Sequence, residues 1–278
     1  MINDMISVIT ICYNEVANIK ETLDSIVGQT YHDLELIVVD GGSTDGTKDI
    51  IASYEEHIAW WCSEPDNGIY NAMNKGVTHA TGEYVIFMNG GDCFHDHKVL
   101  ERVAEVAEAD ILEGHTVKKG TELRRDLSYD DMAKKLLADG ICHQSAFIRT
   151  SLLRTHPYNE RYRIAADWRF WLQTLLCEGE GVSHQYLGFI VSAIDVNGLT
   201  FSNMKQNMQE RRAILQELLP TTSLSGLTKV LTEYHDMMHD PVIDYALFLS
   251  SNSPTGYNIV RKIAKQVVKL VKCFRTNP

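Results

Sequence analysis

The chain has 278 residues, of which 44% are hydrophobic, so it is large enough to bury a substantial core. Its formal net charge of -11 disfavours a general nucleic-acid binder, because contacts to phosphates need clustered Lys and Arg. The six scattered cysteines form no CxxC pair, and neither a signal peptide nor a run of about 18 apolar residues is evident. We therefore expect a cytoplasmic protein that has no nucleic-acid partner.

Strands and helices are predicted to alternate along the first half of the chain. Apolar, β-branched runs predict strands at 6–13, 34–39, 59–63, 83–88 and near Ile111. Helical patterns lie between them, at 16–27, 47–54, 70–79 and 98–107. This alternation predicts an α/β fold with a mostly parallel, doubly wound central sheet.

The second half of the chain is less regular. Helices are expected at 128–139 and 168–177, strands at 145–148 and 184–194, and helical structure from residue 203 onward. We expect three parts, which are an α/β domain at 1–200, a helical extension at 201–256 and a basic helix at 257–278.

Polar side chains follow the three long predicted strands at their carboxyl ends. They are Tyr13 and Glu15 after the first strand, Asp40 after the second and Asn89 to Asp92 after the third. Ligands of open parallel sheets bind at this edge, so one site is expected there. Asp40, in VVDGGSTDGT, either accepts hydrogen bonds from a nucleoside or acts as a local cap in a tight turn.

The NGGD segment, Asn89 to Asp92, offers a carboxylate for a divalent cation that would neutralise a diphosphate leaving group. A plain turn is the alternative, since one Asp makes a poor metal cage. Upstream, Asp66 lies in another turn, and Gly76 is expected to end the following helix. Lys75 in that helix either approaches a phosphate or offsets the helix dipole.

The segment AADWRFWLQ, residues 165–173, places Asp167 where a helix is expected to begin. Asp167 is either a general base that removes the proton of an acceptor hydroxyl or the N-cap of that helix. Trp168 and Trp171 either face a sugar or belong to the core, and for Trp171 the core is favoured.

The segments VITICYNE, LELIVVDGGSTDGT, ATGEYVIFMNGGD and AADWRFWL occur in this order within residues 5–200. Together they resemble glycosyltransferase family 2, the inverting transferases of the GT-A fold. EPDNGIYNAMNKG is similar to a bacterial subgroup that builds exopolysaccharide, capsule, colanic-acid-like and O-antigen chains. The resemblance implies a Rossmann-like, mostly parallel sheet flanked by helices, with a helical C-terminal region.

The resemblance also implies roles for individual residues. The residues that bind the nucleotide sugar would be Cys12, Tyr13, Glu15, Asp40, Asp66, Asn74, Lys75 and Asn89. Asp92 would hold Mg or Mn, and Asp167 would be the catalytic base. His143, Gln144 and Trp168 would lie near the diphosphate or the acceptor, although a structural role is the alternative for His143.

Three positions depart from the family pattern. Asn89-Gly90-Gly91-Asp92 lacks two carboxylates of the usual Asp-x-Asp-Asp, which weakens the expected metal site. Met73 stands where many members have Arg, so Lys75 would have to supply that phosphate contact. Asn197-Gly198-Leu199-Thr200 is a looser match to a Gly-Gly-x-Ser stretch.

These features predict an inverting glycosyltransferase that moves a sugar from a nucleotide-diphosphate donor to a hydroxyl in cell-surface polysaccharide synthesis. The resemblance implies a UDP-sugar as donor and a glycan or polyprenyl-linked acceptor. Two alternatives stay open. One is a degenerate transferase that binds a nucleotide sugar or a partner without catalysis, and the other is a nucleotidyltransferase, which the glycine-free CYNEVANIK disfavours.

Residues 257–278 carry six basic residues and no acidic one. Apolar residues recur at helical spacing from Val260 to Phe274, so basic residues occupy the other face. Such a helix either lies on an anionic membrane surface or packs against the acidic body of the protein or a partner. The first arrangement would place the protein peripherally at the inner face of the membrane.

Overall fold

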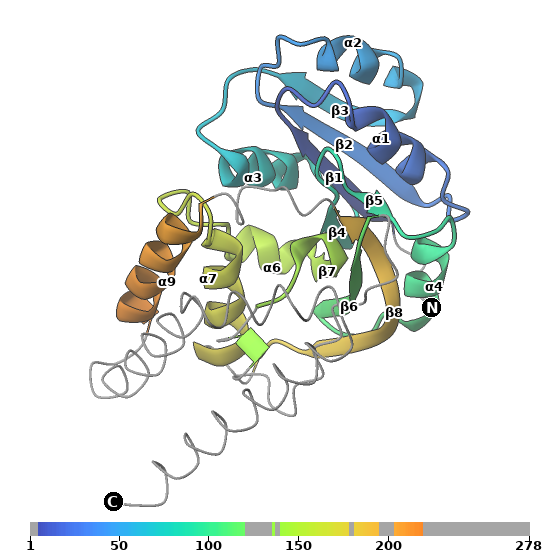
Figure 1. The fold of residues 1–278 in the computed structure, drawn as a ribbon. Helices are drawn as coiled ribbons and strands as arrows, with labels where there is room; N and C mark the ends of the chain where they lie inside the picture. The colour runs from blue at the N-terminus through green and yellow to red at the C-terminus, as the bar shows by residue number, and fades with distance from the viewer. Residues whose placement is uncertain (1–4, 120–134, 137–139, 178–180, 195–202, 219–278) are drawn as a thin grey trace, which may run out of the picture. The chain divides into compact units, whose positions relative to one another are not determined.

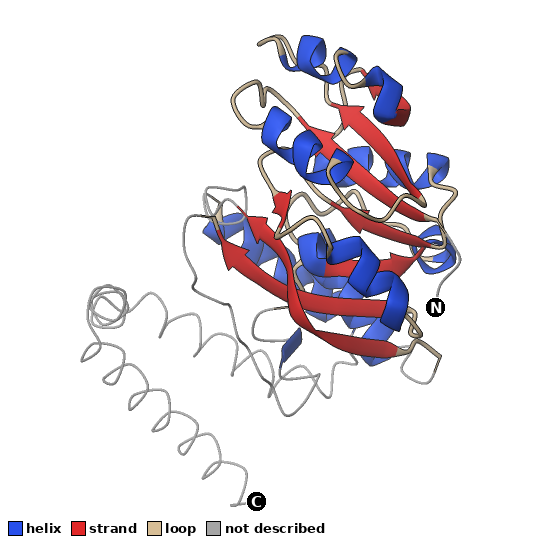
Figure 2. Cartoon of the chain, turned by 90° about the vertical axis from the view of Figure 1, so that its right-hand side faces the viewer, coloured by secondary structure: helices blue, strands red, loops and turns tan. Residues whose placement is uncertain are grey.

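The computed structural model describes residues 5–119, 135–136, 140–177, 181–194 and 203–218. All of them belong to one compact unit, Met1–Leu218. They form a mixed α/β fold built on a curled eight-stranded sheet with helices on both faces (Figures 1 and 2). Most of the predicted helix at 128–139, the Asn197–Thr200 stretch, most of the helical extension and the basic helix at 257–278 lie outside the described residues.

The sheet has the strand order β3-β2-β1-β4-β7-β6-β8-β5. Its strands are β1 (Ile6–Cys12), β2 (Leu34–Asp40), β3 (Ile58–Ser63), β4 (Tyr84–Phe87), β5 (Cys93–Phe94), β6 (Ile111–Lys118), β7 (Ala146–Arg149) and β8 (His184–Ile194). The first four strands pair in parallel, as the sequence predicts. Beyond β4 the sheet is mixed, because β7 runs antiparallel to both β4 and β6 while β6 and β8 are parallel.

Helices cover both faces of the sheet. They are α1 (Ile19–Val27), α2 (Thr47–Ala52), α3 (Ile69–His79), α4 (Val99–Val106), α6 (Thr150–Thr155), α7 (Ala166–Leu172) and α9 (Met204–Leu218), with short turns η1 (Glu55–His57), η2 (His143–Ser145) and η3 (Gln173–Cys177). Helices α1 and α4 pack on one face, whereas α3, α6 and α7 lie on the other (Figures 1 and 2). This arrangement leaves the carboxyl ends of β1, β2 and β4 to meet at one edge.

Successive side chains of β1 point to opposite faces of the sheet and pack against the helices on each face. Ile6 and Val8 are fully buried in the core cluster shared with α1. Ile9 points to the opposite face, where a Cβ on Gly76 would lie only 2.5 Å from its Cγ2 atom. Gly76 therefore lies inside α3, which continues to His79, and it permits close packing of helix on strand instead of ending the helix.

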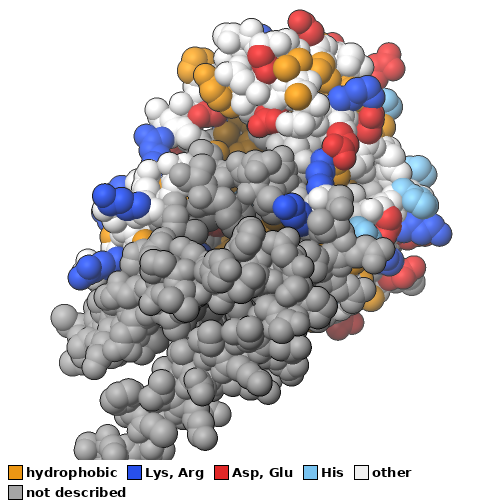
Figure 3. All heavy atoms as spheres, in the orientation of Figure 1, with side chains coloured by type: hydrophobic (Ala, Val, Ile, Leu, Met, Phe, Trp, Pro, Cys, Tyr) orange, Lys and Arg blue, Asp and Glu red, His pale blue; other side chains and the backbone are white. Residues whose placement is uncertain are grey.

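No helix within the described ranges is both long and apolar enough to cross a bilayer. On the face shown in Figure 3, acidic and basic side chains are interspersed over the described surface, and apolar side chains are exposed on its upper part. Two large apolar side chains that follow β1 are exposed, Tyr13 by 63% and Val16 by 42%. Exposed apolar residues at the carboxyl end of a parallel strand mark this edge as a place for a ligand.

Candidate functional site

The loops after β1 and β2 are fastened to each other. The backbone N–H of Asn14 donates to Ser43 Oγ at 2.7 Å, and the N–H of Thr44 donates to Asn14 Oδ1 at 3.0 Å. Asn14 has a φ of 53°, a conformation that Asn tolerates better than most residues. The two loops therefore form one unit at the edge of the sheet.

The buried side chain of Asp40 stabilises the loops after β1 and β2. Its side chain is fully buried and accepts hydrogen bonds from the N–H of Ser43 at 2.9 Å and from Ser63 Oγ at 2.5 Å. Cys12 Sγ lies 3.7 Å from Asp40 Oδ1, and burial, followed by the charge of Asp40, raises the pKa of this thiol. Both carboxylate oxygens thus already have protein donors, so a direct contact of Asp40 with a nucleoside stays a prediction.

The side chains of Tyr13 and Asp66 pack over the buried backbone of Gly41. A Cβ at residue 41 would lie 2.8 Å from Asp66 Oδ2 and 3.3 Å from Tyr13 Cδ2. No side chain larger than hydrogen fits between these two groups, so the buried Gly41 lets Asp66 and Tyr13 pack closely on the main chain. The predicted nucleotide residues Cys12, Tyr13, Asp40 and Asp66 are thus contiguous.

The NGGD segment lies directly beside the loop after β1. A Cβ on Gly90 would be 3.1 Å from both Cys12 Cβ and Glu15 Cγ. The N–H of Gly91, which has a φ of +95°, donates to the buried hydroxyl of Thr22 on α1 at 2.9 Å. Packing against α1 and β1 therefore positions this segment next to Glu15.

A chain of hydrogen bonds leads from the NGGD segment to Asp167. Asn89 Nδ2 lies 3.0 Å from His143 Nε2, and His143 Nδ1 lies 3.0 Å from Asp167 Oδ2. With the Asn89 amide donating, the ring hydrogen is on Nδ1 and is donated to Asp167. Asn89 Oδ1 is buried and accepts no hydrogen bond from the described residues, which suits a ligand hydroxyl or a water.

Asp167 lies in the first turn of α7, and its side chain is 19% exposed. Its Oδ1 atom accepts from Tyr70 Oη at 2.7 Å and from the N–H of Trp168 at 2.8 Å. Burial acts to raise the pKa of Asp167, but the hydrogen bonds from His143 and Tyr70 outweigh it and hold the pKa below its ordinary value. The carboxylate is therefore ionised at neutral pH and able to accept a proton.

Gln144 links the same turn to Asp92. Its Nε2 atom donates to Asp92 Oδ2 at 2.9 Å, and Asp92 is 6% exposed. From the short turn η2, the side chain of His143 contacts Asp167 and that of Gln144 contacts Asp92. Four residues predicted for the site therefore lie close together and near Asn89, namely Asp92, His143, Gln144 and Asp167.

Three other predicted residues have partners within the protein. Asn74 holds the backbone N–H and C=O of Tyr158, at 2.9 and 2.8 Å. Lys75 Nζ pairs with Glu64 Oε1 at 2.6 Å. Trp168 is 3% exposed, and its ring N–H donates to a backbone carbonyl at 2.5 Å. Their predicted contacts with a ligand stay predictions.

Two residues that position Asp167 were not singled out from the sequence. Tyr70 donates to Asp167 across 97 residues of chain. Glu210 on α9 accepts hydrogen bonds from the backbone N–H groups of residues 163–165, immediately before α7, at 2.8 to 3.0 Å. The only sequence signal for Tyr70 was its place in the EPDNGIYNAMNKG motif, and Glu210 had none.

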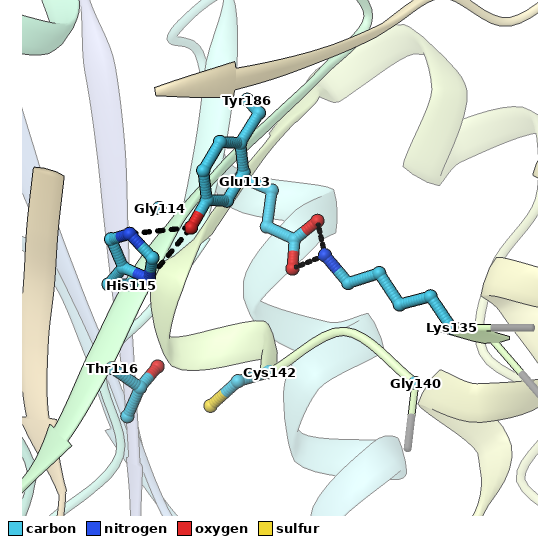
Figure 4. Close-up of a pocket in the computed structure, with 8 residues that line it drawn as sticks. All are labelled: Glu113, Gly114, His115, Thr116, Lys135, Gly140, Cys142 and Tyr186. Atoms are coloured by element: carbon cyan, nitrogen blue, oxygen red, sulfur yellow. Dashed lines mark hydrogen bonds and ion pairs between the residues drawn. The ribbon is translucent and has the colours of Figure 1, made fainter. Parts of the chain in front are cut away.

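A small polar pocket lies on β6 and β8, beside η2 (Figure 4). Lys135 Nζ is 2.5 Å from both carboxylate oxygens of Glu113, and the hydroxyl of Tyr186 lies against the ring of His115. Cys142 closes the side that faces η2. The charges of this pocket compensate one another, so it holds the β6–β8 side of the sheet against the segment that leads into η2.

The residues around Asp92 fit a divalent cation only in company with a diphosphate. No group of three or more His, Cys, Asp or Glu side chains suited to a metal ion occurs within the described ranges. Mg²⁺ often binds through one or two carboxylates together with substrate phosphates and water. Asp92 can supply one such carboxylate, and Gln144 holds it in place.

The profile of a family described as Glycosyl transferase family 2 matches residues 7–165 of this chain. The chain is also similar to a PGL/p-HBAD biosynthesis glycosyltransferase of Mycobacterium bovis. The two are 38% identical over 174 residues, which cover 60% of this chain and 68% of the relative.

Two solved structures are similar in fold. TarS residues 1–349 of S. aureus in complex with UDP-GlcNAc has a TM-score of 0.61 at 21% identity, with 87% of this chain and 75% of that chain covered. The mannosyltransferase PcManGT of Pyrobaculum calidifontis, in complex with GDP-Man and Mn²⁺, has a TM-score of 0.62 at 19% identity, with 96% and 81% covered. The chain spans 45% of a longer TarS chain.

These likenesses confirm the predicted GT-A fold. The family profile covers β1 to β7 and ends just before α7, and it spans more than half of the chain. The chain belongs to glycosyl transferase family 2.

Proposed function

We propose that this chain transfers a sugar from a UDP-sugar to an acceptor hydroxyl with inversion at the anomeric carbon. The observation that carries this proposal is the continuous set of contacts from Asp40 and Cys12, past Asn89 and His143, to Asp167. These contacts support a nucleoside at the loop after β1 and a base at Asp167, both adjoining the NGGD segment. The complexes of TarS with UDP-GlcNAc and of PcManGT with GDP-Man support a nucleotide sugar as donor.

The nucleoside is proposed to bind at Tyr13. Its ring is exposed, and an aromatic face stacks on any nucleobase. Asp66 packs on Gly41 beside Tyr13 and offers an acceptor to a base or ribose donor. The fastened loops after β1 and β2 keep this surface in place before the ligand arrives.

Asp167 is proposed to remove the proton of the acceptor hydroxyl. The acceptor oxygen attacks the anomeric carbon from the face opposite the diphosphate, the bond from that carbon to the diphosphate oxygen breaks, and configuration inverts in one displacement. His143 and Tyr70 orient the carboxylate during this step. Mg or Mn, held by Asp92 and the diphosphate, would supply charge neutralisation for the leaving group.

A thermal-shift panel of UDP-, GDP- and dTDP-sugars, with and without Mn²⁺, tests the proposed function. A UDP-sugar at 100 times its Kd stabilises the native state by about 2.7 kcal/mol, which raises Tm by roughly 5–10 °C. Mn²⁺ alone should shift Tm little, because Asp92 is a single carboxylate, and Mn²⁺ should enlarge the shift caused by the UDP-sugar.

Tyr13→Ala is the matched control for this panel. Because the side chain is exposed, the variant should melt like the wild-type protein without ligand and respond less to a UDP-sugar. If no nucleotide sugar raises Tm, the proposed function is wrong. A normal shift without release of UDP in the presence of any acceptor would favour the degenerate transferase.

We further propose that the acceptor is a glycan or polyprenyl-linked glycan of cell-surface polysaccharide synthesis, reached at the inner membrane face through residues 257–278. The basic charge of that segment supports this proposal, since each Lys or Arg near an anionic surface contributes about 1 kcal/mol. The full chain should co-sediment with anionic vesicles at low salt, and a chain that ends at residue 256 should not. Neutral vesicles are the control, and equal sedimentation of both chains would contradict the idea.

A further inference from the structure

Arg163 lies against the backbone at the start of α3. Its Nη1 atom is 2.7 Å, and its Cζ atom 3.9 Å, from the point where a Cβ on Gly68 would stand. Gly68 also has a φ of +111°, which residues with side chains rarely adopt. The guanidinium therefore covers bare main chain at the N-terminal end of this helix.

This position lies between the proposed nucleoside edge and the proposed base. The N–H of Gly68 donates to Asp66 Oδ1 at 2.7 Å. The carbonyl of the residue after Arg163 accepts from Tyr70 Oη at 2.8 Å, and the same hydroxyl contacts Asp167. Arg163 thus packs on the turn that carries Asp66, and it directly precedes the residue whose carbonyl shares the Tyr70 hydroxyl with Asp167.

The backbone that carries Arg163 is held firmly. Glu210 accepts hydrogen bonds from the N–H groups of Arg163 at 3.0 Å, Ile164 at 2.8 Å and Ala165 at 3.0 Å. Three consecutive amides on one carboxylate fix the turn, so the side chain of Arg163 starts from a defined point.

The guanidinium of Arg163 has no ion-pair or hydrogen-bond partner in the part of the chain that the structure describes. Nearby cations differ, since Arg161 and Arg169 both pair with Glu217, at 3.3 and 2.7 Å. A cation at a helix N-terminus also opposes the positive end of the helix dipole. A bound anion beside the guanidinium would relieve this repulsion.

We propose that Arg163 and the first turn of α3 bind the diphosphate of the nucleotide-sugar donor, an inference that rests on the proposed function. The planar guanidinium matches two phosphate oxygens at once. The sequence left a phosphate contact missing at Met73, which the structure shows to be fully buried. Lys75, the expected substitute, is paired with Glu64, whereas Arg163 supplies an unpaired cation.

Calorimetric titration of the full chain with UDP and with uridine tests the proposal. Arg163→Gln should weaken UDP binding about 10- to 100-fold and leave uridine binding unchanged, because only UDP carries the diphosphate. Arg161→Gln removes the same charge two residues away and should leave both affinities unchanged. Arg163→Lys keeps the charge without the planar fork and should recover part of the lost affinity.

Equal UDP affinity of Arg163→Gln and the wild-type protein would overturn the proposal. So would an equal loss for UDP and uridine, which would mean that the variant disturbs the nucleoside edge instead. If the wild-type protein bound neither ligand, the proposed function itself would fail, and this outcome is distinct from both others.

Discussion

Asp167→Asn is expected to reduce turnover of the donor in the presence of acceptor by about 10²–10⁴-fold, the usual contribution of a positioned general base. The amide has nearly the shape of the carboxylate but cannot take a proton at neutral pH. UDP binding should stay within about twofold of the wild-type value, because the proposed role of Asp167 concerns the acceptor and His143 separates it from the NGGD segment. Single-turnover release of UDP, measured beside UDP titrations, separates the two effects.

Tyr70→Phe is the matched control for this substitution. It removes one hydrogen bond to Asp167 Oδ1 and leaves the carboxylate and its contact with His143 in place. We expect turnover to fall by less than in Asp167→Asn, about 10- to 100-fold, since one hydrogen bond to a charged group contributes about 1.5–3 kcal/mol. A normal rate for Asp167→Asn would show that another group takes the proton.

Asp40→Ala is expected to lower the free energy of unfolding by about 3 kcal/mol, because several buried donors lose their acceptor. The fully buried carboxylate serves the N–H and hydroxyl of Ser43 and the hydroxyl of Ser63, and alanine would leave these donors unsatisfied. Urea unfolding at neutral pH measures the change.

Asp33→Ala is the control for the stability measurement. Asp33 precedes the same strand at its other end and is exposed, so its loss should change the unfolding free energy by less than about 0.5 kcal/mol. Similar stabilities of the two variants would show that the turn after β2 does not depend on the carboxylate.

Much of the parallel half of the fold could be predicted from local sequence. Strands buried on both faces are continuous apolar runs, and β1, β2 and β4 are found within one residue of their predicted starts. The half of the sheet beyond β4, which has both parallel and antiparallel pairs, was harder to predict. The short helix α6 was missed, and β6 was expected as a short strand but spans eight residues, because its pairing with β8 lies about 70 residues away in the chain.

The chemical identity of the site residues could be predicted better than their surroundings. A sequence shows that Asp40 follows a strand, but it does not show that the turn already surrounds the carboxylate with donors. It shows Lys75 on a helix, but not the pairing with Glu64 eleven residues earlier. Whether a side chain already has hydrogen-bond or ion-pair partners within the protein depends on the tertiary structure, so it could not be predicted from the motifs.

The hydrogen bonds from the turn before Asp167 to Glu210 have a consequence for chimaeric enzymes. The proposed base, Asp167, lies directly after a turn that is held by a helix more than 40 residues later in the chain. Exchanging the region after residue 200 between related transferases would therefore change the position of Asp167 as well as any acceptor preference.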